Sequence, residues 1–335
     1  MANTANQIDI ADPAVMADHI GHLTTPSFHR MKFRAMNTDI EAVIWCPEPS
    51  FDEIREKAED WFRFVEERFS RFREGSELSH LNRHAGKRCM ISDTMLEVLM
   101  LAEEYRRITA GIFDPLIAKS LIAAGYRESF DHLRIRQEPL SYISTRNETS
   151  AKHSIDLDPG MKSVVLPRDT QIDLGGIVKS WAVEHLSAWM QSDWGIIRGM
   201  VNAGGDLAVW GGIREEQADG WQIGIEHPWR HEEDIHTLHL LDGAAATSSK
   251  LGRNWLTDRG IKHHLIDPRS MTPSESDVVQ CTVVGTDAIS CEVWAKTICI
   301  LGAAEGKRLF ADRAEDYEAF VFTADRQMQI WRCSS

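Results

Sequence analysis

The sequence predicts an α+β protein in which mixed, largely antiparallel sheets pack against helices. Apolar residues recur at three- and four-residue steps in separate stretches, as they do on the buried face of a helix. Short alternating stretches typical of strands lie between them, without the regular strand-helix alternation of a doubly wound parallel sheet. The chain has 335 residues, 43% of them apolar, and is therefore long enough to bury a substantial core.

The chain opens with a polar stretch. Residues 1–30 show no sustained period, so we expect a loosely ordered lead-in there and one domain over residues 31–335. Phe33 to Trp45 alternates as a strand does, and the prolines that follow break the chain before a helix expected at 51–69. One face of this helix should be core, because its apolar positions share that face. They are Ile54, Ala58, Trp61, Phe62, Val65 and Phe69.

Later segments supply the remaining elements. Ser92 and Asp93 resemble the N-cap of a second helix that continues towards Thr109. A mixed, polar region from Leu133 to Val165 ends in an apolar step that predicts hairpin strands. The other expected elements are a helix at 177–190, strands at 199–202, 221–225, 238–240 and 281–284, and a final helix at 289–301.

Composition excludes several classes of function. A formal net charge of -14, with no stripe rich in Lys and Arg, argues against nucleic-acid binding. The six cysteines lack metal-ligand spacing, so we expect neither a zinc site nor a disulfide framework. No stretch approaches the ~20 apolar residues of a membrane span, and residues 1–20 lack the basic start and apolar core of a secretory signal. We therefore expect a cytoplasmic protein that does not enter a membrane.

The segment Asp173-Leu174-Gly175-Gly176-Ile177-Val178-Lys179 is the first candidate ligand site. We expect its glycines between a short strand and a helix, where missing Cβ atoms let a phosphate approach exposed N–H groups. Lys179 can add a positive charge for the same anion. Taken alone, the segment also fits a tight strand-to-helix turn, because it is not a full phosphate-loop motif.

A second glycine pair stands in Asn202-Ala203-Gly204-Gly205-Asp206, at the end of an expected strand. Asn202 and Asp206 add polar groups that can contact hydroxyls or amides. One such turn carries little weight. Two of them favour a ligand cleft, because glycine is costly in chain entropy.

Adjacent histidines, His263 and His264, precede Leu265-Ile266-Asp267-Pro268-Arg269. Neighbouring strand residues point to opposite faces, so only one histidine should face a given site. That histidine can act as a base near neutral pH, because its ordinary pKa lies close by. The alternative is a pair of surface histidines on an edge strand.

Further motifs complete a pattern that resembles a known family. They are Glu67 to Phe72, Ser76 to Asn82, Gly111 to Pro115, Ala246-Thr247-Ser248, and a closing segment from Cys281 to Gly302. In this order, and together with the glycine and histidine segments, they resemble the ApbE family of FAD:protein FMN transferases over residues 31–305.

The resemblance implies an ApbE-like, T-fold-related α+β architecture and a transferase. Family members move FMN from FAD to a Thr or Ser hydroxyl of a target flavoprotein and release AMP, so the implied partners are FAD and that protein. His264 is implied as the base that takes the hydroxyl proton. The implied cofactor-binding residues are Met36, Asn82, Asp114, Gly175, Gly176, Lys179, Asn202, Gly204, Gly205, Asp206, Thr247, Ser248 and His264.

The resemblance also implies Mg²⁺, held by the backbone carbonyl at Val178 and by two side chains four residues apart on a late helix. The matching side chains here are Glu292 and Lys296. The spacing puts both on one helical face, but an ammonium has no lone pair for magnesium. Lys296 either takes over part of the metal's charge in catalysis or only pairs with Glu292. Ser180 and Met271 depart from the family pattern too, each at a position where glycine is expected.

Two other functions remain open. The first is a flavin-binding carrier that has kept the cleft and lost transfer because Lys296 displaced the metal. The second is hydrolysis of FAD to FMN and AMP, with water in place of the acceptor hydroxyl. Product analysis with and without a protein acceptor separates these alternatives.

Overall fold

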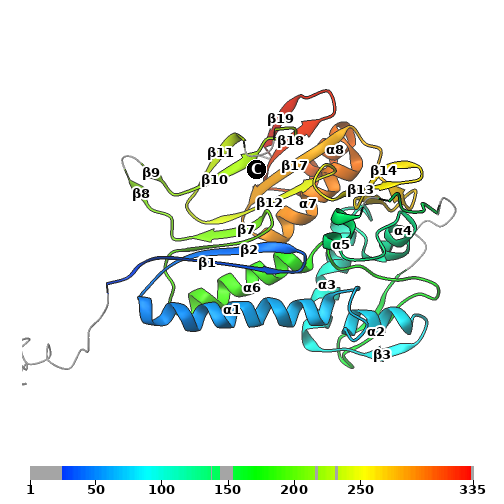
Figure 1. Cartoon of the computed structure of the whole chain (residues 1–335), viewed down its shortest axis with the longest axis horizontal. Helices are drawn as coiled ribbons and strands as arrows, with labels where there is room; N and C mark the ends of the chain where they lie inside the picture. The colour runs from blue at the N-terminus through cyan, green and yellow to red at the C-terminus, as the bar shows by residue number, and fades with distance from the viewer. Residues whose placement is uncertain (1–24, 137, 144–153, 216–217, 231–232, 333–335) are drawn as a thin grey trace, which may run out of the picture.

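An eight-stranded antiparallel sheet forms the centre of the protein (Figure 1). The computed structural model describes residues 25–136, 138–143, 154–215, 218–230 and 233–332. In spatial order the strands are β1 (Ser27–Ala35), β2 (Thr38–Cys46), β6 (Gly199–Ala203), β7 (Asp206–Trp210), β12 (Gly243–Ser249), β17 (Val278–Gly285), β18 (Glu318–Thr323) and β19 (Met328–Arg332). Helices pack on this sheet, so the α+β prediction is confirmed.

Three helices cover one face of the sheet. Figure 1 shows α1 (Glu48–Phe69) and α6 (Val178–Ser192) beneath the end formed by β1, β2 and β7. The third, α7 (Ala288–Leu301), packs against β12 and β17, and α8 (Ala303–Arg313) packs on α7. Because α6 contacts both α1 and α7, it lies at the centre of the helical layer.

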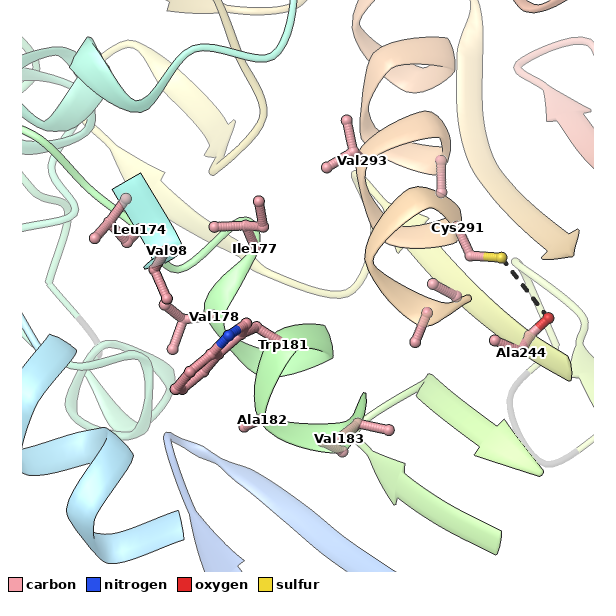
Figure 2. Close-up of a cluster of buried hydrophobic side chains, with 14 of the residues drawn as sticks. Val98, Leu174, Ile177, Val178, Trp181, Ala182, Val183, Ala244, Cys291 and Val293 are labelled. Carbon is pink, nitrogen blue, oxygen red and sulfur yellow. Dashed lines mark hydrogen bonds between the residues drawn. The ribbon is translucent and has the colours of Figure 1, made fainter. Parts of the chain in front are cut away.

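The core between the helices and the sheet follows the apolar periodicity of the sequence. On α1, Ile54, Ala58, Phe62, Val65 and Phe69 are all buried. Figure 2 shows Trp181 of α6 in a cluster of buried side chains that also includes Val98. The cluster continues to α7, where the Cys291 thiol donates to the carbonyl of Ala244 at 3.7 Å.

A β-hairpin covers part of the opposite face. It is formed by β10 (Trp221–Glu226) and β11 (Asp234–Leu240). Its Ile225 and Leu238 join a second buried cluster that includes Leu207, Phe320 and Phe322 of the large sheet. Within the described residues, no helix is both long and apolar enough to cross a membrane.

The remaining helices and strands complete the fold. The helices are α2 (Glu77–Arg83), α3 (Asp93–Ile108), a 3-10 turn at Pro115–Ile117, α4 (Ala118–Ala123) and α5 (Phe130–Ile135). The strands are β3 (Arg88–Met90), β4 (Asp156–Asp158), β5 (Ser163–Val165), β8 (Arg214–Glu215), β9 (Ala218–Asp219), β13 (Asn254–Thr257), β14 (Gly260–His263), β15 (Ile266–Asp267) and β16 (Thr272–Pro273).

Most of the expected elements are present, with boundaries that shift by a few residues. The helices expected at 51–69, 93–109, 177–190 and 289–301 correspond to α1, α3, α6 and α7. The Ser92 hydroxyl accepts from the N–H of Met95, which confirms its role as N-cap. The strands expected at 199–202, 221–225, 238–240 and 281–284 are confirmed as parts of β6, β10, β11 and β17.

Four expectations about the elements were wrong. The single strand expected at 33–45 is a hairpin, because Met36 and Asn37 adopt φ of 52° and 57° and form a two-residue turn between β1 and β2. Its first strand begins at Ser27, inside the stretch expected to be a lead-in, of which residues 1–24 lie outside the described part. No strand leads directly into Gly175, since residues 166–174 form none, and α7 is not the last element, because α8, β18 and β19 follow it.

The turn between β6 and β7 depends on Gly204. This residue has φ of 65°, and a Cβ built on it would lie 1.9 Å from the Thr38 hydroxyl oxygen. Gly195 has a similar φ of 62° but no atom within 4 Å of such a Cβ. The two glycines therefore separate the cost of backbone strain from the cost of a steric clash.

We predict that Gly204→Ala lowers the free energy of unfolding more than Gly195→Ala does. Overpacking at Gly204 should add about 1–3 kcal/mol to the strain that both variants share. Urea unfolding of the two variants and the wild type measures the difference. Equal losses in both variants would show that the contact with Thr38 imposes no constraint.

Candidate functional site

A cavity of about 500 Å³ lies where loops from both halves of the chain meet the helical layer. This volume suits a small-molecule ligand. The predicted residues that line it are Met36, Asp114, Gly175, Gly176, Val178, Lys179, Gly204, Gly205, Thr247, Ser248, His264 and Lys296. The structure thus brings together most of the residues that the sequence suggested for one site.

Four predicted residues lie outside the lining of this cavity. Asn82 holds the chain ahead of the first glycine pair, because its amide donates to the carbonyl of Ile172 and accepts from the N–H of the same residue. Asn202 accepts from the N–H of Gly205 and lines a smaller neighbouring cavity of about 270 Å³. Asp206 and Glu292 are buried behind the cavity wall and pair with lysines that line it.

Asp173 fixes the shape of the first glycine segment. One carboxylate oxygen accepts from the N–H of Gly175 at 2.8 Å, and the other pairs with Arg71 Nε at 2.6 Å. A Cβ on Gly176 would lie 3.3 Å from both Lys296 Cε and Phe113 Cε2. The missing side chain at Gly176 therefore lets the stem of Lys296 lie against this loop, directly ahead of α6.

A buried charge network underlies the cavity and joins α6, α7 and β7. Lys179 forms an ion pair with Asp206, and its Nζ lies 3.6 Å from Glu292 Oε1. Lys296 Nζ lies 2.5 Å from the same Oε1. The Ser180 hydroxyl and backbone N–H both donate to Glu292 Oε2. Each lysine therefore has its own carboxylate, and both carboxylates are almost wholly shielded from solvent.

Glu292 remains ionised although its side chain has 0% exposure. Burial alone would raise its pKa, but the charges of Lys296 and Lys179 and the hydrogen bonds from Lys296 and Ser180 lower the pKa to about 2. Although Glu292 belongs to α7, its carboxylate lies at the N-terminus of α6, where it accepts from the N–H of Ser180. This location also lowers its pKa, because a helix N-terminus favours a negative charge. Burial opposes the charged form of Lys179 as well, yet Asp206 and Glu292 outweigh it and raise the pKa of Lys179.

His264 faces the cavity, whereas its neighbour His263 does not line it. The Nδ1 atom of His264 lies 3.3 Å from the carbonyl of Arg253, so it carries the proton and leaves the lone pair on Nε2. His263 Nε2 instead contacts the carbonyl of Ser274 at 3.0 Å. Burial, together with the charges of Arg253 and Lys296, holds the pKa of His264 well below its usual value. His264 is therefore neutral at pH 7.

Several residues of the cavity wall were not identified from the sequence. The Arg71 guanidinium lies 4.1 Å from the centre of the Phe72 ring and 4.6 Å from that of Tyr126. All three residues line the cavity, as does Arg253. Arg71 and Phe72 belong to a segment that carried the family resemblance, and that was the one signal available for them. Nothing in the local sequence pattern distinguished Tyr126 or Arg253.

The sequence profile of the ApbE family matches residues 36–321, which is most of the chain. The chain belongs to the ApbE family. The profile spans every cavity residue discussed above, from Met36 to Lys296. The family resemblance inferred from the motifs is therefore confirmed.

Relatives of this ApbE chain are distant in sequence. An FAD:protein FMN transferase of Vibrio cholerae is 27% identical over 246 residues, which cover 72% of this chain and 71% of that protein. One of Salmonella typhimurium is 24% identical over 223 residues, or 65% of this chain, and the match spans 62% of that protein's length. The solved structure of an ApbE protein of Thermotoga maritima is similar with a TM-score of 0.78 at 21% identity, covering 90% of this chain and 96% of that one. This last likeness shows that the fold is shared.

The residues at the expected metal position do not fit Mg²⁺. Both oxygens of Glu292 already accept hydrogen bonds, and the Lys296 ammonium lies where a second oxygen ligand was expected. No group of three or more His, Cys, Asp or Glu side chains in the described ranges is placed to hold a metal ion. Two departures from the family pattern, Ser180 and Lys296, thus converge on one carboxylate.

The third departure from the family pattern, Met271 in place of a glycine, is explained by its backbone conformation. Met271 adopts φ of 54°, in the left-handed region that favours glycine. It is buried at a turn that leads from β15 into β16. Methionine therefore keeps the backbone shape expected of a glycine there, at the cost of some strain.

We predict that Lys296→Thr creates a metal site that the wild type lacks. The substitution frees Glu292 Oε1 and places a hydroxyl four residues away on the same face of α7. It also removes one partner of a buried ion pair, which should cost about 3–5 kcal/mol of stability without metal. Mg²⁺ and Mn²⁺ titrations of the variant, followed by calorimetry and thermal unfolding, measure both effects.

Lys307→Thr, on the exposed surface of α8, is the matched control. Only Lys296→Thr should bind the metals and regain stability with them. Identical titrations for the wild type and Lys296→Thr would show that Glu292 cannot act as a ligand even when its ammonium partner is removed.

Proposed function

We propose that the protein is an FAD:protein FMN transferase that moves FMN to a Thr or Ser hydroxyl of an acceptor flavoprotein and releases AMP. One observation carries the proposal: a neutral histidine and a set of cations share one glycine-lined cavity. A phosphoryl transfer needs these parts, because the hydroxyl must lose a proton while the phosphate charge is held. The named relatives from Vibrio cholerae and Salmonella typhimurium support this choice of reaction.

The chain's residues divide the work as follows. The acceptor oxygen forms a bond to the phosphorus of the FMN half, and the bond from that phosphorus to the bridging oxygen breaks. AMP leaves with the electron pair, and His264 Nε2 takes the proton of the hydroxyl. The carbonyl of Arg253 orients the ring from the opposite side, at Nδ1. The glycine segments at 175–176 and 204–205 leave room for the nucleotide to approach the backbone.

Mg²⁺ has no part in these steps as we propose them. The donor set at Glu292 is already filled by Lys296 and Ser180. Positive charge at the cavity comes from side chains, which belong to the protein and do not have to be bound from solution as a metal ion does. Chelation should therefore leave transfer by the wild type unchanged, in contrast to an enzyme that depends on magnesium.

We place the acceptor flavoprotein in the cytoplasm. The five cysteines within the described ranges are free thiols, as is typical of a reducing compartment. The surrounding surface must admit a protein hydroxyl to the cavity, because FMN leaves the site attached to the acceptor. Neither nucleic acid nor membrane has a part in this scheme.

Incubation of the protein with FAD and candidate acceptor flavoproteins tests the proposal. Transfer predicts that the intact mass of one acceptor rises by one FMN while an equal amount of AMP appears. FMN and AMP formed equally well without an acceptor would indicate hydrolysis. Bound FAD without any product would indicate a carrier, and either outcome would overturn the transferase assignment.

We predict that His264→Ala lowers the transfer rate by about 10²- to 10⁴-fold, the usual contribution of a general base. FAD affinity should change little, because the base acts on the chemical step and not on binding. His263→Ala is the matched control, since the adjacent ring does not line the cavity. Single-turnover rates and FAD binding are measured for both variants, and an unchanged rate in His264→Ala would remove this residue from the mechanism.

We predict that the acid limb of the pH profile of kcat/KM for FAD lies below pH 6.5. The pKa of His264 is lowered by burial and by the charges of Arg253, Lys296 and His263, so the base stays unprotonated as the pH falls past the usual histidine value. Activity should then fall only at more acidic pH, where Nε2 takes a proton. A limb at or above pH 6.5 would contradict the neutral state of His264.

A further inference from the structure

The cations around the cavity differ in whether a carboxylate neutralises them. Arg71 pairs with Asp173, and its guanidinium also donates to the carbonyl of Tyr126. Lys179 pairs with Asp206 and Lys296 with Glu292. Each of these three lysine and arginine side chains is thus balanced by an acidic side chain of its own.

Arg253 is the exception among the described cavity residues. It is partly buried, and its guanidinium forms no ion pair or hydrogen bond with any part of the chain that the structure describes. Leaving a partly buried cation without a partner is costly unless a ligand supplies the opposite charge. The planar fork of a guanidinium matches the oxygens of a phosphate and can bind them in pairs.

The position of Arg253 links it to the base. The residue precedes β13, and its backbone carbonyl accepts from His264 Nδ1. Its charge also acts on Lys179 of α6 and on Tyr126, as well as on His264. These three groups come from separate segments of the chain and line the same cavity as Arg253.

We propose that Arg253 binds the pyrophosphate of FAD through its guanidinium while its backbone carbonyl orients His264. The inference rests on the proposed transferase function and deepens it, because it assigns the anion-binding side chain. Lys179 and Lys296 suit this role less well, since each already donates to a buried carboxylate. Arg253 then positions both the pyrophosphate, through its guanidinium, and the ring of His264, through its carbonyl. The distance between the phosphate and the base therefore depends on the position of this one residue.

Anion binding at Arg253 also bears on the base itself. The positive charges of Arg253 and Lys296 lower the pKa of His264, and a bound pyrophosphate offsets them. A bound pyrophosphate therefore counteracts the part of the lowered pKa that comes from these charges, while the larger effect of burial remains.

Binding of FAD and of riboflavin to the wild type and Arg253 variants tests the inference. Riboflavin has the same ring system and ribityl chain but no phosphate, so it reports contacts to the ring and that chain alone. Arg253→Gln should weaken FAD binding by about 10- to 100-fold, as expected for lost hydrogen bonds to a charged group, and leave riboflavin binding unchanged. Arg253→Lys keeps the positive charge but loses the planar fork. Its affinity for FAD should therefore lie between those of the wild type and Arg253→Gln.

Arg259→Gln is the matched control, because this exposed arginine lies in the turn of the same β13–β14 hairpin, outside the cavity. It should bind both flavins as the wild type does. Equal loss of FAD and riboflavin in Arg253→Gln, or no loss of either, would overturn the assignment of Arg253 while leaving the transferase proposal in place. A wild type that binds FAD but transfers no FMN would overturn the proposed function instead.

Discussion

The carboxylate of Glu292 is the group on which the rest of the site depends. It lies on α7 with no exposure to solvent, yet it accepts from Ser180 at the start of α6 and pairs with Lys296 on its own helix. Lys179, which also approaches it, continues the network to Asp206 at the start of β7. An uncompensated charge at this depth would cost several kcal/mol, about 3–5 when one partner of a buried pair is removed. The network therefore holds two helices and a strand in one arrangement beneath the cavity.

This constraint determines which groups remain free for chemistry. Since Lys179 and Lys296 neutralise buried carboxylates, their net contribution to the cavity is small, although their donors still face it. The neutral state of His264 follows first from its burial and then from the positive charges of Arg253 and Lys296, all of which lower its pKa. Through Lys296, the buried network thus contributes to the protonation state of the proposed base.

Patterns local in sequence could be predicted, and contacts between distant segments could not. The face of α1 follows from apolar spacing, and the Glu292–Lys296 pair follows from a four-residue step on a helix. The hairpin at Met36 and Asn37 was missed because its turn lacks the glycine that usually marks one. Asn82 was assigned to the cofactor, but it holds the backbone of Ile172, ninety positions along the chain. Arg253 gave no signal, because what distinguishes it is the absence of a partner among the described residues, and only the fold reveals that.

Charge balance explains why the loss of a metal ligand at Lys296 is compatible with a phosphate site. A divalent cation on a single carboxylate leaves one net positive charge, whereas the Lys296 ammonium on Glu292 leaves none. Lys179 does not make up the difference, because Asp206 balances it. The role proposed for Arg253 would supply this charge on a planar guanidinium, whose residue contacts His264 through its own carbonyl. In this proposal the charge that meets the anion belongs to the chain, and its position is set by folding and not by the supply of an ion.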